Sequence, residues 1–81
     1  MAATLEVTIL SPDELLFQGR ATKVILPGEQ GVFEVCPFHR PLISRLLSGY
    51  VLVDDAAIPI KRGVVKVARD VLTAIVEPEA G

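Results

Sequence analysis

The chain has 81 residues, of which 51% are hydrophobic and only 5% aromatic, so one small domain with an aliphatic core is expected. The net charge is −2 and the basic residues are dispersed, which argues against a nucleic-acid partner. The single cysteine, Cys36, cannot form an intrachain disulfide, and the single histidine, His39, cannot complete a zinc site that needs two histidines. No apolar run approaches the ~18 residues of a membrane-spanning helix.

Alternating apolar and polar residues dominate the first half of the chain and predict strands. In residues 5–9 the apolar side chains at odd positions share one face, which is the pattern of a half-buried strand. Ser11-Pro12-Asp13 ends this strand, because proline removes a backbone donor and serine and aspartate favour turns. Pro27-Gly28 is the strongest turn signal in the chain. Further strands are expected over residues 15–17, 21–26 and 32–36.

The second half continues the same pattern, with tight turns expected at Asp54-Asp55 and at Arg62-Gly63. Residues 42–47 are expected to be extended, because Ser48-Gly49 ends the segment too early for a helix. Pro59 cannot donate a ladder hydrogen bond, so its strand should lie at an edge or pair only in part. The other expected strands are 50–53, 57–60, 64–67 and 71–76, followed by a short tail over residues 77–81.

About nine short strands separated by turns, without a segment of helical periodicity, predict an all-β sandwich or barrel. The domain is expected to comprise residues 1–76, followed by a short tail over residues 77–81.

No combination of residues predicts a catalytic, cofactor-binding or metal-binding site. The serines and His39 lack the G-x-S-x-G motif that would suggest a nucleophile. The loop Gly28–Gly31 carries Glu29 where a phosphate-binding loop would carry lysine, and no helix follows it. Cys36 ends an apolar strand and is expected to be a small buried hydrophobe of low reactivity. Asp54-Asp55 is expected to be a solvated hairpin tip.

His39 is the most notable polar residue, because it lies in a loop between Pro37 and Pro41. Two prolines restrict the backbone of this loop before any partner binds, and rigid loops frequently carry function.

Several segments, taken in chain order, resemble one protein family. The most specific is Pro37-x-His39-x-Pro41-Leu42, which is similar to the family motif P-x-H-A-P-L. Together the segments cover residues 5–76, and they resemble the N-terminal domain of the epsilon subunit of rotary ATP synthases, called delta in mitochondria. The other similar segments are residues 5–9 with Ser11-Pro12, Pro27-Gly28-x-x-Gly31, residues 63–67 and residues 72–76.

The sequence departs from the family pattern at loops and at expected contact surfaces. Phe38 stands where the family usually has glycine or asparagine, and Arg40 stands where it has alanine. Glu34 replaces a glycine, Arg62 replaces the first of two paired glycines, and Lys66 replaces an acidic residue. We therefore expect a divergent member with altered partner contacts.

The resemblance implies a sandwich of two antiparallel sheets with about nine or ten short strands, and a non-catalytic subunit without a cofactor. Such a subunit clamps the gamma subunit to the c-subunit ring of a proton-translocating ATP synthase and helps to transmit torque. It implies a peripheral location on the cytoplasmic side of an energy-transducing membrane, with membrane contact only through the complex and no nucleic acid. The residues implied to face the c ring are Gly28, Glu29, Gln30, Gly31 and Val32, and those implied to face gamma are Ser11, His39 and Ser44.

Most members of the family continue into a C-terminal helical hairpin where this sequence ends, so regulation by those helices is not expected of these 81 residues. Two other functions remain open at this point. A lipoyl or biotinyl carrier domain would have a similar size, but it needs a lysine at a hairpin tip, and Lys61 is the nearest match. A generic small β interaction module is the other alternative.

Overall fold

The computed structural model describes residues 3–79, which form eight strands and no helix, so the predicted all-β class is confirmed. A helix long and apolar enough to cross a membrane is accordingly not found in these residues. The strands are β1 (Leu5–Leu10), β2 (Leu15–Ala21), β3 (Val24–Gly28), β4 (Gly31–Val35), β5 (Leu42–Leu46), β6 (Gly49–Val53), β7 (Ala56–Ala68) and β8 (Val71–Pro78).

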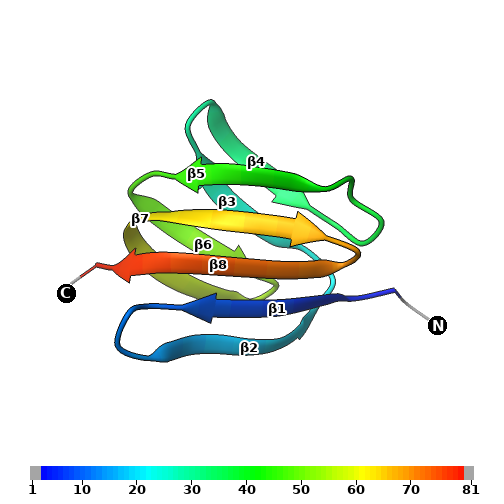
Figure 1. The fold of residues 1–81 in the computed structure, drawn as a ribbon, viewed down its shortest axis with the longest axis horizontal. Coiled ribbons are helices and arrows are strands. Elements are labelled where there is room, and N and C mark those ends of the chain that lie inside the picture. Colours follow the sequence, from blue (N-terminus) through cyan, green and yellow to red (C-terminus); the bar gives the residue numbers. More distant parts are fainter. Residues whose placement is uncertain (1–2, 80–81) are drawn as a thin grey trace.

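The strands form two layers that face each other across the core (Figure 1). The front layer has the order β2, β1, β8, β7, β5, and the rear layer contains β6, β3 and β4. Strand β7 belongs to both layers, because its first half pairs with β6 and its second half pairs with β5 and β8. The expected sandwich is therefore present, with its two sheets joined through the shared strand β7 and, at one residue pair, through β3 and β5.

One pairing departs from the expected antiparallel pattern. Strands β1 and β8 are parallel, with Glu6 opposite Val71 and Leu10 opposite Ile75. Antiparallel neighbours usually follow from a tight hairpin, and no hairpin links the first strand to the last. The parallel direction of β1 and β8 is therefore compatible with the long stretch of chain that separates them.

The core is made only of aliphatic side chains. The first strand is oriented as predicted, because Leu5, Val7 and Ile9 are buried. Each such side chain contributes about 1.5–3 kcal/mol of stability on burial. Within residues 3–79 no polar or charged residue is buried, so the interior contains no polar side chain that needs a partner. The remaining buried residues are Ala21, Val24, Leu26, Val35, Leu46, Val51, Val53, Ile60, Val65, Val67, Leu72, Ala74 and Val76.

The predicted boundary between the second and third strands is wrong. Strand β2 continues through Gly19 to Ala21, and the chain then changes layer at Thr22 and Lys23. Gly19 does not end the strand, because it pairs with Val7 of β1 like any other residue of the ladder.

The turn predicted at Arg62-Gly63 is also wrong, because strand β7 runs through these residues without a break. The pairing of β7 with β8 shifts register between Ile60 and Arg62, and such a bulge bends a strand. Figure 1 shows this bend, where β7 passes from the rear layer to the front layer. Gly63 permits the bend, since a Cβ atom there would lie 2.7 Å from the Ile75 carbonyl oxygen.

Pro59 pairs only in part, as predicted. It lies opposite Tyr50 of β6, while its carbonyl oxygen accepts a hydrogen bond from the Glu79 backbone N–H at 3.2 Å. Strand β8 extends to Pro78, two residues beyond the expected boundary. Glu77 forms an exposed ion pair with Arg62, whose Nε lies 2.7 Å from the carboxylate. Residues 80–81 of the expected tail lie outside the described residues.

Asp54 is more than the solvated hairpin tip that the sequence suggested. It adopts a positive φ of 48° in the turn between β6 and β7. Its carboxylate accepts hydrogen bonds from the Thr22 hydroxyl at 2.7 Å and from the Thr22 and Lys23 backbone N–H groups at 3.1 Å. The Thr22 hydrogen bonds hold the pKa of Asp54 below its ordinary value. This turn therefore fixes the link between β2 and β3.

Replacing Gly63 by alanine should destabilise the domain. The new methyl group would meet the backbone of Ile75 and Val76, which cannot move without disturbing the β7–β8 ladder. We expect Gly63→Ala to lower the free energy of unfolding by about 1–3 kcal/mol in urea denaturation. Gly19→Ala is the control, because a Cβ there lies 3.6 Å from the nearest atom, and its effect should stay within about 0.5 kcal/mol. Equal effects of the two variants would contradict this account of β7.

The hydrogen bonds to Asp54 should make stability depend on pH. Because folding lowers the pKa of Asp54, its contribution is present above the ordinary aspartate pKa of about 3.9 and is lost as pH falls through the lower, folded value. Asparagine also tolerates a positive φ, so Asp54→Asn should remove the carboxylate without straining the turn. The variant should therefore have a lower Tm than the wild type at pH 7, and nearly the same Tm at strongly acidic pH, where the Asp54 carboxylate is protonated. Asp55→Asn is the matched control. A Tm difference that is constant with pH would argue against this role.

Candidate interaction surfaces

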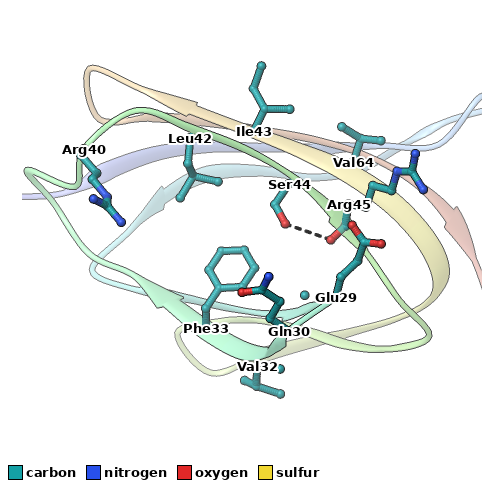
Figure 2. Close-up of a pocket in the computed structure, with 12 residues that line it drawn as sticks. Glu29, Gln30, Val32, Phe33, Arg40, Leu42, Ile43, Ser44, Arg45 and Val64 are labelled. Carbon is teal, nitrogen blue, oxygen red and sulfur yellow. Dashed lines mark hydrogen bonds between the residues drawn. The ribbon is translucent and has the colours of Figure 1, made fainter.

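An open groove of about 880 Å³ runs between the β3–β4 hairpin and strand β5. Its floor includes Phe33 of β4 and Leu42 of β5, which are both half-buried against the core. Figure 2 shows both side chains pointing into the space between the two strands. Val32 and Ile43, which precede and follow these residues in the sequence, point away from the space on its two sides, and each is 73% exposed (Figure 2). The groove therefore offers an apolar surface that the core leaves uncovered.

The charged residues of the groove differ between its two sides. Arg40 and Arg45 come from the β5 side, whereas Glu29 comes from the hairpin (Figure 2). All three residues are exposed. The groove can therefore present charge of either sign at its edges around an apolar floor.

The hairpin itself is formed by a two-residue turn, Glu29-Gln30, between Gly28 and Gly31, as predicted. Gly31 has a φ of 119°, a conformation that side chains rarely permit. At Gly28 the need for glycine is different, because a Cβ atom would lie 2.7 Å from the Phe33 ring. The two glycines thus allow the tight turn and let Phe33 pack over the base of the hairpin.

Ser44 lies in this groove, across from the hairpin. Its side chain alternates inward with Leu42 and Leu46 along β5, and its hydroxyl donates to the Arg45 carbonyl oxygen at 3.0 Å. Ser44 therefore lies opposite Glu29 and Gln30 (Figure 2). The family resemblance implies that Ser44 faces gamma, whereas it implies that Glu29 and Gln30 face the c ring.

Ser11 lies at the end of β1 and organises the turn into β2. Its hydroxyl accepts hydrogen bonds from the Asp13 and Glu14 backbone N–H groups, at 3.3 and 3.1 Å. Its backbone N–H donates to the Glu14 carbonyl oxygen at 2.8 Å. Ser11 is therefore part of a well-fixed turn.

His39 lies at the other end of β1. The backbone of its loop reaches the β7–β8 turn, where Phe38 N–H donates to Asp70 Oδ1 at 2.7 Å and Glu6 N–H donates to the Asp70 carbonyl oxygen at 2.8 Å. Since strands rise about 3.4 Å per residue, Glu6 and Ser11 are roughly 17 Å apart. The structure thus does not bring Ser11, His39 and Ser44 together in one cluster.

The His39 ring is tied to its own loop. Its Nδ1 lies 2.7 Å from the Arg40 carbonyl oxygen, which can only accept, so Nδ1 carries the proton. The His39 backbone N–H donates to the Cys36 carbonyl oxygen at 3.2 Å. The loop between the two prolines is therefore ordered by its own hydrogen bonds.

The prediction that Cys36 is buried is wrong, because the residue follows β4 and is partly exposed. Its thiol donates to the Glu34 carboxylate at 3.4 Å, since side chains two residues apart on a strand point the same way. The Glu34 hydrogen bond is the main cause of a raised pKa of Cys36. A raised pKa lowers the thiolate fraction, which agrees with the low reactivity expected from the sequence.

A row of apolar side chains crosses the outer face of the front layer, and sequence reasoning missed it. Leu15, Leu10, Ile75 and Val64 lie opposite one another in the registers of β2, β1, β8 and β7. Leu15, Ile75 and Val64 are each about half exposed. The four residues lie on four different strands, so only the high apolar content pointed to such a surface.

The described residues offer no group of three or more His, Cys, Asp or Glu side chains that could hold a metal ion. We therefore assign no metal ligand among them.

Comparison with known proteins identifies the family. The family model of the ATP synthase delta/epsilon chain beta-sandwich domain matches residues 4–78. An ATP synthase epsilon chain of Nitratiruptor sp. is 38% identical over 79 residues, which are 91% of this chain and 61% of that relative. The chain thus spans about three fifths of the length of this relative.

Two solved structures contain a chain with the same fold. One is a cryo-EM structure of the Euglena gracilis mitochondrial ATP synthase (OSCP/F1/c-ring), with a TM-score of 0.82 and 18% identity over 91% of this chain and 51% of that chain. The other is the central stalk and c-ring of the Tetrahymena thermophila mitochondrial ATP synthase, with a TM-score of 0.74 and 13% identity over 93% of this chain and 64% of that chain. With a family match over nearly its whole length and the same sandwich, the chain belongs to the beta-sandwich domain family of ATP synthase delta and epsilon chains.

Proposed function

We propose that this chain is a non-catalytic part of the central stalk of a proton-translocating rotary ATP synthase, where it joins the gamma subunit to the c ring and helps to transmit torque. The observation that carries this proposal is the family match over residues 4–78, which includes both expected contact regions. The Tetrahymena structure of similar fold is described as a central stalk with a c-ring, which supports the same assignment.

A torque-transmitting body must resist shear, and the construction of the sandwich supports the proposal that this domain can do so. Its two layers share β7 and enclose an aliphatic core without a buried polar residue among residues 3–79. Close-packed interiors have low compressibility and transmit strain. The mechanical role therefore requires no chemistry from the chain itself.

For the c ring, we propose contact through the hairpin residues Gly28–Val32. The tight turn holds Glu29 and Gln30 at the tip, and Val32 is largely exposed beside them. A short hairpin fixed by two glycines and by Phe33 presents these side chains without a large ordering cost on binding.

For gamma, we propose contact along the front layer. Ser11 and His39 lie beyond opposite ends of β1, so one surface lying along this strand can reach both. The same surface would cover the apolar row of Leu10, Leu15, Val64 and Ile75. Contact with Ser44 would require gamma to reach around the β5 edge into the groove (Figure 2).

We further propose that the chain reaches the membrane only through this complex, on the cytoplasmic side. The alternative of a lipoyl or biotinyl carrier loses its main support, because Lys61 lies within β7 and not at a hairpin tip. A generic interaction module would bind neither gamma nor the c ring specifically, so the following experiment distinguishes it.

Single cysteines should form position-specific crosslinks in the reconstituted complex. In a Cys36→Ala background, Ser11→Cys and His39→Cys should crosslink to gamma, and Glu29→Cys should crosslink to a c subunit. Asp55→Cys, in the β6–β7 turn, is the control and should give neither product. Products are identified by mass spectrometry of the crosslinked bands.

Crosslinks from Glu29→Cys to gamma alone would contradict the proposed c-ring contact. Failure of all three cysteines to reach either partner, in a complex that contains the chain, would contradict the stalk role as a whole.

A further inference from the structure

Strained backbone is concentrated at one end of the sandwich. Four non-glycine residues in the described part of the chain have a positive φ, and three of them are Phe38, Arg69 and Asp70. These three meet where the loop after β4 contacts the β7–β8 turn, since Phe38 N–H donates to Asp70 Oδ1. Sparsely populated conformations of this kind tend to gather at functional sites.

Phe38 is the most unusual of the three. Its φ is 68°, in the left-handed region where the Cβ atom crowds the following carbonyl group. Aspartate enters this region more readily, because its short polar side chain can hydrogen-bond locally. A phenylalanine gains no such hydrogen bond, so its conformation must be imposed by the surrounding structure.

The surrounding structure imposes it with several contacts. The 2.7 Å hydrogen bond to Asp70 holds the Phe38 backbone, and Asp70 is itself anchored through its carbonyl oxygen to Glu6 N–H. The following residue is held by the hydrogen bond from His39 N–H to the Cys36 carbonyl oxygen. Pro37 precedes Phe38 and fixes its own φ. The loop is therefore preorganised around this residue.

The domain gains almost nothing from the Phe38 ring in return. Phe38 is 84% exposed, more than any other large hydrophobic residue of the described chain, and its ring is not among the side chains that pack against the core. An exposed aromatic ring on a strained backbone stabilises neither the loop nor the sandwich. A small residue without a Cβ atom would satisfy the same backbone geometry at lower cost.

We propose that Phe38 is an anchor residue, whose ring inserts into an apolar pocket on the gamma subunit. The inference rests on the proposed function, in which the adjacent His39 faces gamma. Aromatic side chains are enriched at protein interfaces and dominate their energetics, because each buries a large area with few rotatable bonds. A loop fixed before binding loses little conformational freedom on association, which increases the affinity that the ring supplies.

The test separates the ring from the backbone. Phe38→Gly removes the ring and relieves the strain, so Tm should rise by a few degrees while binding to gamma in the reconstituted catalytic head weakens about tenfold or more. Arg69→Gly is the matched control, because it relieves a φ of 52° in the neighbouring turn and leaves the ring in place. It should raise Tm without changing affinity, and Phe38→Tyr should bind like the wild type. Binding is measured by biolayer interferometry and Tm by calorimetry.

Four outcomes would overturn the proposal. If Phe38→Gly binds like the wild type, the ring is not an anchor, and if its Tm does not rise, the residue is not strained. Equal weakening by Phe38→Gly and Arg69→Gly would mean that loop order, not the ring, determines affinity. Phe38-dependent binding to lipid vesicles without gamma would assign the ring to the bilayer. Failure of the wild-type chain to bind gamma would instead reject the proposed function itself.

Discussion

Strand β7 is the constraint on which the rest of the structure depends, because it is the strand that both layers share. Its first half pairs with β6 in the rear layer, and its second half pairs with β5 and β8 in the front layer. The bulge between Ile60 and Arg62 turns the strand from one layer to the other without breaking its pairing. Because β7 continues through the bend, one uninterrupted strand takes part in the pairing of both layers.

The groove is a consequence of the same geometry. Strands β5 and β3 meet at a single pair among the described residues, Leu46 with Gly28, and the two layers diverge from that point. The divergence leaves a gap between β4 and β5 that the aliphatic core does not fill, and the half-buried side chains of Phe33 and Leu42 line it. The hairpin proposed to face the c ring therefore grows from the place where the sandwich opens, and Phe33 packs over its base.

Local pattern was sufficient to predict the fold class and the buried faces. Alternation placed Leu5, Val7 and Ile9 in the core, and Pro27-Gly28 with Gly31 marked a real hairpin. Pattern failed where the outcome depended on partners distant in sequence. Arg62-Gly63 reads locally as a turn, yet its pairing with β8 keeps it in a strand, and nothing near Asp54 in the sequence shows that it will bind Thr22.

The candidate site was predictable only in part, for the same reason. The family resemblance named Ser11, His39 and Ser44 position by position, but it could not show how they lie relative to one another. The inward alternation of β5 places Ser44 in the groove, while Ser11 and His39 lie beyond opposite ends of β1. The apolar row from Leu15 to Val64 could not be predicted from the sequence. Each of four strands contributes one residue to it, and only the register of these strands brings the four residues side by side.

Two turn aspartates show how this small domain fixes its connections without polar groups in its core. Asp54 precedes β7 and Asp70 follows it, each with a positive φ, and each carboxylate accepts backbone N–H groups from a connection that is distant in sequence. Asp54 holds the link between β2 and β3, and Asp70 holds the loop that carries Phe38 and His39. Because these hydrogen bonds lie at the surface, the interior remains aliphatic and the loops are still ordered. The strain at Phe38 is sustained by the second of these contacts, so the ends of the shared strand β7 also determine how the proposed gamma-facing loop is presented.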